Sequence, residues 1–234
     1  VSVFALVAVL LLAVLRGRFH EALLTGDGVL LRRPTFAEIR ENLRLRAVGF
    51  LLGAGLLIYL AHAALFYFLK DLALQTGGGD VGLFFTLSMV AMIAVRVFGG
   101  ALFDKVDKLI VLQIILVLLI PCLIALPHAH ARTVFYLLAG TYGLCMGVCL
   151  PLLNALLFSA SPPLLRGLNT NLSLFTLDMA YFLMPYLGGL LITFGAGFKL
   201  LFYVAAGFVL FSFTFIMNLS HPFINSEHKK GLNV

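Results

Sequence analysis

Five long stretches of this 234-residue chain contain no Asp, Glu, Lys or Arg. They cover residues 47–69, 109–131, 133–165, 179–198 and 200–226. The hydrocarbon core of a bilayer is about 30 Å thick, and a helix crosses it with about 20 apolar residues. Each stretch is therefore long enough for one crossing. The pattern predicts an all-α fold, a polytopic transmembrane helical bundle.

Composition excludes the other broad classes. Hydrophobic residues make up 62% of the chain and charged residues 11%, with a mean hydropathy of +1.09, whereas soluble domains carry about a quarter charged residues. A membrane β-barrel would show short segments of alternating polarity, and the sequence has none. Cys122, Cys145 and Cys149 fall within predicted spans, and their odd number and spacing predict small packing residues rather than disulfides or a zinc site.

The uncharged stretches and the turns between them divide the chain into four parts. Residues 1–15 are apolar but short for a crossing, and basic residues follow them instead of preceding them as in a signal peptide. We therefore expect the end of a truncated transmembrane helix there. We expect a cytoplasmic loop at 16–46, a six-helix bundle at 47–220 and a cytoplasmic tail at 221–234. The six predicted crossings are 47–69, 81–103, 109–126, 133–158, 168–194 and 199–219.

The polar loop before the bundle contains a helix-start pattern. Glu38 follows Thr35 by three residues, which is the spacing of a capping box. Phe36, Ile39 and Leu43 then recur at helical spacing. The segment predicts a short amphipathic helix that either lies on the membrane surface or links two parts of the protein in water.

Basic residues predict the orientation of the bundle, because cytoplasmic loops are enriched in Lys and Arg. If the 16–46 loop is inside, alternation of the spans leaves three basic residues outside, Lys70, Arg132 and Lys199. Twelve lie inside: Arg16, Arg18, Arg32, Arg33, Arg40, Arg44, Arg46, Lys105, Lys108, Arg166, Lys229 and Lys230. The net charge of +6 thus reflects topology and contact with anionic membrane lipids, and we expect no nucleic-acid partner.

The turn "RVFGGALFDKVDK" at residues 96–108 concentrates five charged residues between two apolar spans. Its Gly100, Asp104, Lys105 and Lys108 resemble the conserved turn of the major facilitator superfamily, which reads Gly, three residues, Asp, a basic residue, any residue, Gly and further basic residues. The sequence departs from that pattern at Asp107, which takes the place of the second Gly.

A second region is similar to the tenth and eleventh helices of the same family. The residues that match are Pro163, Arg166, Gly167, Asp178, Pro185, Gly188 and Gly189. The resemblance implies a transporter of twelve helices in two halves. This chain would supply the last helix of the first half, the central loop and the whole second half, and its partner would be the N-terminal half.

The charged turn has two interpretations. Asp104 at the membrane edge can accept hydrogen bonds from the free N–H groups that begin a helix. The resemblance implies that this helix belongs to the other half. The turn, with Gly100, Lys105, Lys108 and Arg166 nearby, would then be a gating latch. Alternatively, its charges only fix the topology and remain in water.

Three polar residues within the predicted spans are candidates for transport or coupling. Asp178 lies near the middle of its span, where a carboxylate is costly and usually functional. It can serve proton coupling or substrate contact, or it can pair structurally with a missing helix. Asn154 bridges helices or faces a cavity, and Arg96 extends to the interface or contacts substrate. For His62 we expect a packed, hydrogen-bonded side chain.

These features predict a secondary transporter that moves a small organic molecule across the cell membrane by alternating access. We expect proton coupling, and the resemblance around Asp178 favours export. Uptake by a proton symporter and a non-transporting scaffold or sensor of the same fold remain alternatives. The sequence contains no G-x-S-x-G, H-E-x-x-H or paired intramembrane acids, so it predicts no enzyme and no cofactor or metal.

Overall fold

The computed structural model describes residues 35–99, 107–195 and 197–231. Within them the chain is helical, with no strand, which confirms the predicted all-α fold. The helices are α2 (Phe36–Arg44), α3 (Arg46–Thr76), α4 (Val81–Phe98), α6 (Lys108–Ala125), α7 (Arg132–Ala160), α8 (Arg166–Thr193) and α9 (Phe198–Gly231). Two short 3₁₀ turns, η2 (Leu126–His128) and η3 (Pro163–Leu165), follow α6 and precede α8.

Six of these helices, α3, α4, α6, α7, α8 and α9, are long and apolar enough to cross a membrane. Most of their ends lie within three residues of the predicted ends. Two differ more. α3 continues past Lys70 and Asp71 to Thr76, because a charged pair ends an apolar run without ending a helix. The helix stops instead at Gly77, whose φ of 69° needs the left-handed conformation that glycine adopts freely. α9 continues beyond residue 219 to Gly231.

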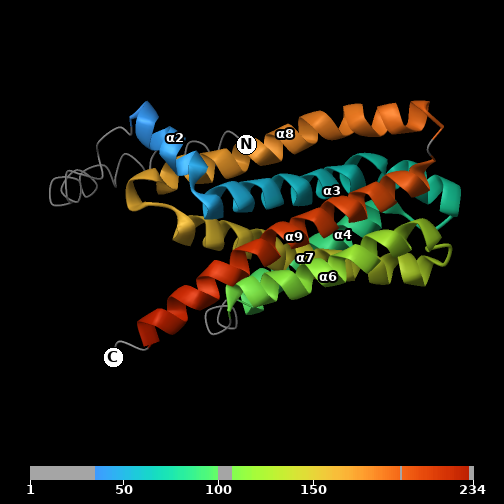
Figure 1. Cartoon of the computed structure of the whole chain (residues 1–234). Coiled ribbons are helices and arrows are strands. Elements are labelled where there is room, and N and C mark those ends of the chain that lie inside the picture. Colours follow the sequence, from blue (N-terminus) through green and yellow to red (C-terminus); the bar gives the residue numbers. More distant parts are fainter. Residues whose placement is uncertain (1–34, 100–106, 196, 232–234) are drawn as a thin grey trace, which may run out of the picture.

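The helices pack in a fixed order across the bundle (Figure 1). α3 packs mainly against α8 and α9, α6 lies between α7 and α9, and α4 packs mainly against α7. No substantial contact joins α4 to α8, and these two spans are the least buried of the six. One side of the bundle, between α4 and α8, is therefore uncovered.

Small residues bring α4 and α7 close together. A Cβ atom added to Gly143 would collide with the backbone of Ser88, and one added to Gly147 would lie 3.0 Å from the Cα of Met92. The Ser88 hydroxyl donates to the carbonyl of Ala139 at 2.9 Å across the same contact. The small-xxx-small spacing of the two glycines thus lets the two backbones approach directly.

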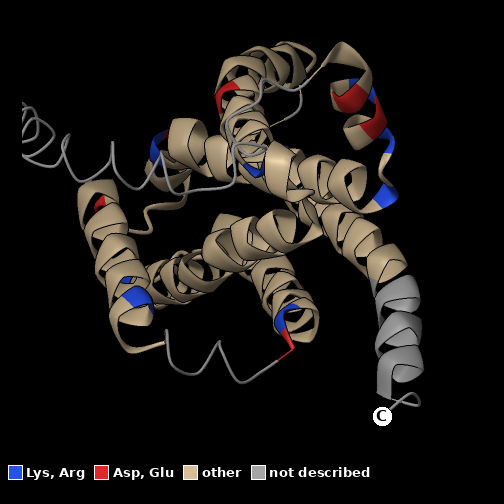
Figure 2. Ribbon diagram, turned by 90° about the vertical axis from the view of Figure 1, so that its left-hand side faces the viewer, with Lys and Arg blue, Asp and Glu red and all other residues tan. Residues whose placement is uncertain are grey.

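The segments that connect the spans alternate between the two ends of the bundle, as predicted for consecutive membrane crossings. α2, the joint between α7 and α8, and the end of α9 lie at one end, and the joints that follow α3 and α8 lie at the other (Figure 1). Figure 2 looks at the first of these ends and shows that most of the ribbon carries no charged residue. All predicted cytoplasmic segments within the described residues thus share one end.

Helix α2 begins with the predicted capping box. The Glu38 carboxylate accepts a hydrogen bond from the Thr35 backbone N–H at 2.8 Å, and the Thr35 hydroxyl accepts one from the Glu38 N–H at 3.4 Å. The reciprocal bonds satisfy two of the donors that a helix start leaves free. This confirms the helix that the loop sequence predicts.

Candidate functional site

Asp178 occupies the middle of α8, twelve residues after its first residue and fifteen before its last. At 1.5 Å per residue it lies about 18 Å from the start of the helix. Its side chain is exposed on the surface of this bundle and forms no hydrogen bond or ion pair with any residue that the structure describes. The described residues thus supply no counter-charge for a carboxylate at this depth.

An aromatic cluster lies one helical turn from Asp178. Tyr181 is three residues further along α8, and residues three apart on a helix are neighbours. Its ring lies 6.1 Å from the ring of His62, 5.6 Å from that of Phe66 and 5.9 Å from that of Tyr67, between centroids. α3 supplies all three of these rings, so the cluster joins α3 to α8.

The same cluster reaches α4 through Phe66. The ring centroids of Phe66 and Phe85 are 5.9 Å apart. Phe66 therefore lies between α4 and α8, on the uncovered side of the bundle. It is 52% exposed and Tyr67 is 40% exposed. These two large rings are therefore partly exposed on the uncovered side of the bundle.

His62 is hydrogen-bonded, as predicted. Its Nδ1 and the hydroxyl of Tyr142 on α7 form the bond, and the two rings are nearly parallel. Tyr142 is buried and also packs against Phe84. The pair links α3 to α7 and holds His62 in place behind the aromatic cluster.

Asn154 links two helices. The Ser173 hydroxyl on α8 donates to the Asn154 side-chain oxygen on α7 at 3.0 Å. Tyr59 of α3 lies beside both side chains. Asn154 is also exposed, so the bridging bond is compatible with both predicted roles, that of a helix bridge and that of a residue facing a cavity.

The predicted gating residues are only partly described. Gly100, Asp104 and Lys105 lie outside the described residues. Lys108 is the first residue of α6, and the side chain of Asp107 caps that helix by accepting from the Leu109 N–H at 2.8 Å. Asp107, where the family pattern has Gly, is therefore a helix cap.

Two arginines lie at helix ends on the α2 side of the bundle. Arg96 is in the last turn of α4, exposed, and has no hydrogen-bond partner among the described residues. The guanidinium of Arg166 stacks 4.4 Å from the ring centroid of Phe158. Both lie more than two helical turns from Asp178 along the bundle, so the structure does not bring the predicted arginines and Asp178 together.

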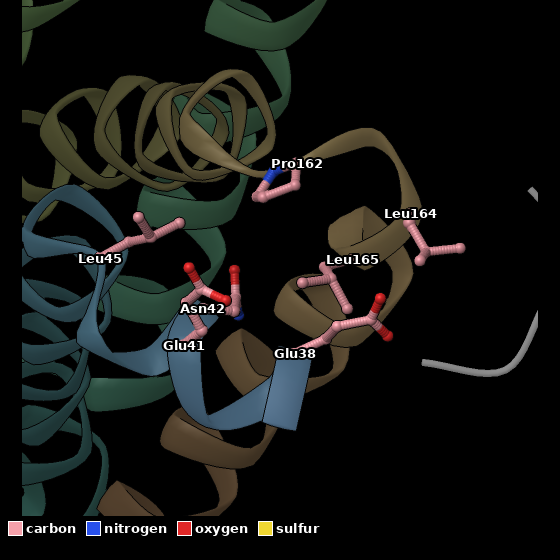
Figure 3. A pocket seen from close by; sticks show the side chains of 7 residues that line it. All are labelled: Glu38, Glu41, Asn42, Leu45, Pro162, Leu164 and Leu165. Atoms are coloured by element: carbon pink, nitrogen blue, oxygen red, sulfur yellow. The ribbon is translucent and has the colours of Figure 1, made fainter. Parts of the chain in front are cut away.

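Helix α2 is attached to the bundle by a buried amide network. Asn42 is 2% exposed and Asn169 is fully buried. The Asn42 amide donates to the Asn169 oxygen at 2.6 Å, and the Asn169 amide donates back at 3.1 Å and to the Ser161 hydroxyl at 2.6 Å. Beside the network is a pocket of about 280 Å³. Figure 3 shows its lining side chains, which come from α2 and the residue after it on one side and from the joint before α8 on the other.

The residues that sequence reasoning missed are Tyr181, Phe66 and Tyr67. A signal was present, because Tyr181 follows Asp178 by three residues and Phe66 follows His62 by four. Both spacings place a ring beside a polar group on one helix face. Which of the many Phe and Tyr residues meet one another depends on how α3 and α8 pack, and the sequence does not encode that locally.

At the other end of the bundle, His128 and His130 have structural partners. His128 Nε2 lies 2.7 Å from the Tyr203 hydroxyl, and His130 Nδ1 donates to the Thr76 carbonyl at 3.1 Å. Across the described residues, no group of three or more His, Cys, Asp or Glu side chains is arranged to hold a metal ion.

Comparison with known families gives one result. The family model described as Major Facilitator Superfamily matches residues 1–172 and, in an overlapping match, residues 51–231. The two matches together span nearly the whole chain. No curated protein matches the sequence.

Proposed function

The chain belongs to the Major Facilitator Superfamily, a family of multi-pass membrane transporters, and we propose that it moves a small organic molecule across the cell membrane by alternating access. In such carriers two bundles rock about a site near the bilayer midplane. The six described spans form one such bundle, and a second bundle, the N-terminal half predicted from the sequence, covers the side between α4 and α8.

The observation that carries the proposal is the position of Asp178. A carboxylate in the middle of a membrane span is costly to keep charged, and Asp178, exposed on the surface of this bundle, has no partner among the described residues. It lies on the helix that borders the uncovered side and beside the exposed rings of Phe66 and Tyr67. That is where a midplane site between two bundles would form.

The proposal includes proton coupling through the same residue. Desolvation favours the neutral form of a carboxylic acid and a nearby cation favours its carboxylate, so an acid at a site that alternates between two surroundings can take up and release a proton. We propose that this exchange drives export of the substrate. The charged turn, with Asp104, Lys105 and Lys108, would hold the cytoplasmic side closed in one state.

The test is flux in proteoliposomes that contain the whole carrier. Uptake or release of a panel of organic cations, anions and neutral sugars is measured with and without an imposed pH gradient. We expect gradient-dependent flux of at least one class, and we expect Asp178→Asn to remove the effect of the gradient. Uptake driven by an inward proton gradient would indicate the symporter alternative. No gradient-dependent flux for any member of the panel would contradict transport and favour a scaffold.

A further inference from the structure

We propose that the transported molecule is a monovalent organic cation with an aromatic or apolar body, such as a protonated or quaternary amine. It would be held by the Asp178 carboxylate and by the rings of Phe66, Tyr67 and Tyr181. This inference rests on the proposed transport function, and it names the substrate class of the same site.

The first argument is charge. Within the described spans, Asp178 is the only charged side chain in a middle section. Arg46, Lys108, Arg132, Arg166 and Lys199 lie in the first turn of their helices, Arg96 lies in a last turn, and Lys70 and Asp71 lie within two turns of the end of α3. An ionised carboxylate in a low-dielectric site needs a counter-charge. Since the described part of this bundle supplies none, a cationic ligand can.

The second argument is the surface beside the carboxylate. Phe66 and Tyr67 are 52% and 40% exposed, and both meet Tyr181 at centroid distances below 6 Å. The faces of aromatic rings attract cations, and the attraction grows when the cation is desolvated. Rings and carboxylate together match a cation whose body is apolar, because the rings also bury its apolar surface.

The third argument is the poor fit of other ligand classes. An organic anion would face Asp178 with no basic residue of the described spans at the same depth. A sugar is held mainly by hydrogen bonds, and two of the polar atoms nearby are already used, the Asn154 side-chain oxygen by Ser173 and His62 Nδ1 by Tyr142. A metal cation needs a set of ligands, and the described residues contain no such group.

The experiment uses two probes of nearly equal size and opposite charge, tetraphenylphosphonium and tetraphenylborate. Binding of each to the whole carrier in liposomes is measured after subtraction of binding to protein-free liposomes. We expect saturable binding of tetraphenylphosphonium only. Asp178→Asn should weaken it about tenfold or more, because the charge attraction and the cation–π attraction act at the same site.

Matched variants separate the site from general effects on folding. Asp178→Glu and Tyr181→Phe keep the charge and the ring, and should bind the cation within about threefold of the parent protein. Phe66→Leu and Tyr67→Leu should each weaken binding severalfold. Asp71→Asn makes the same charge change near the end of α3, away from the cluster, and Phe182→Leu removes an exposed ring of α8 outside the cluster. Both should bind as the parent does.

Equal saturable binding of the two probes, or undiminished cation binding by Asp178→Asn, would overturn the inference. The flux assay with the panel of compounds distinguishes a failure of the cation-site inference from a failure of the proposed transport function. Gradient-driven flux confined to anions or sugars would overturn the cation site and leave transport standing. Selective cation binding lost in Asp178→Asn, without flux of any compound, would support the cation site and contradict transport.

Discussion

The side-chain amides of Asn42 and Asn169 hydrogen-bond to each other in both directions, although 127 residues separate them in the sequence. One belongs to the short helix α2 and the other to the first turns of α8. Both are buried. The contact makes α2 part of the bundle instead of a free linker in water.

Removing this amide pair should loosen α2. Asn169→Ala leaves the amide of Asn42 and the hydroxyl of Ser161 without their partner, and a buried polar group left unpaired costs about 1–3 kcal/mol. Thermal unfolding of the purified protein in detergent measures the loss. Asn218→Ala is the control, because Asn218 is exposed and bonds only to its own helix at Thr214. Equal stability of the two variants would contradict the role of the network.

The glycine seam, where Gly143 and Gly147 of α7 lie against the backbone of α4, predicts opposite effects on stability for alanine substitutions at two glycines of α7. Gly143→Ala should destabilise the protein by about 1–3 kcal/mol, because its methyl group would collide with the Ser88 backbone. Gly140→Ala meets nothing within 4 Å and should stabilise it by about 0.5–1 kcal/mol through helix propensity. Thermal unfolding of both variants tests this, and a Gly143→Ala protein at least as stable as the parent would show that α4 and α7 are not close-packed there.

The hydrogen bond between His62 and Tyr142 predicts that removing the tyrosine hydroxyl will lower the stability of the protein. Tyr142→Phe keeps the ring but leaves a buried imidazole nitrogen unpaired, which should destabilise the protein by about 1–3 kcal/mol. Tyr186→Phe is the matched control, since Tyr186 is 69% exposed. Unfolding curves in detergent measure both. A Tyr142→Phe protein as stable as the control would mean that the bond contributes nothing to folding.

The positions of α2 and of the end of α3 at opposite ends of the bundle predict that they are accessible from opposite sides of the membrane. Glu41 on α2 and Gln75 near the end of α3 are exposed, whereas Cys122, Cys145 and Cys149 are buried. A membrane-impermeant maleimide should therefore label Glu41→Cys from the cytoplasmic side only and Gln75→Cys from the opposite side only. The parent protein, with its buried thiols, serves as the unlabelled control. Labelling of both variants from one side would overturn the topology.

The spans could be predicted from the sequence because each depends on a long uncharged stretch, which is a local property. The start of α2 could be predicted from Thr35 and Glu38 for the same reason. The uncharged stretch places the end of α3 at residue 69, before Lys70, but the helix continues to Thr76 because Gly77 is what ends it. Charge marks where a span leaves the lipid, and backbone conformation marks where the helix ends.

The sequence alone singles out one residue of the candidate site. Asp178 was identified because an acid is rare in an apolar span, and that rarity is visible in one sequence. Its aromatic neighbours were missed because the chain contains 22 Phe and 7 Tyr residues, and only the packing of α3 against α8 selects Phe66, Tyr67 and Tyr181 among them. The amide pair of Asn42 and Asn169 was missed because it joins distant segments.

The glycine seam also bears on how the bundle can move. The fully buried ring of Phe84 on α4 packs against the rings of Phe135 and Tyr142 on α7, so sliding α4 along α7 would require these rings to repack. The Ser88 hydroxyl bond to the Ala139 carbonyl also fixes the register of the two helices, whereas α4 has little contact with α3. Any shift of α4 is thus expected to carry α7 with it and to leave α3 in place.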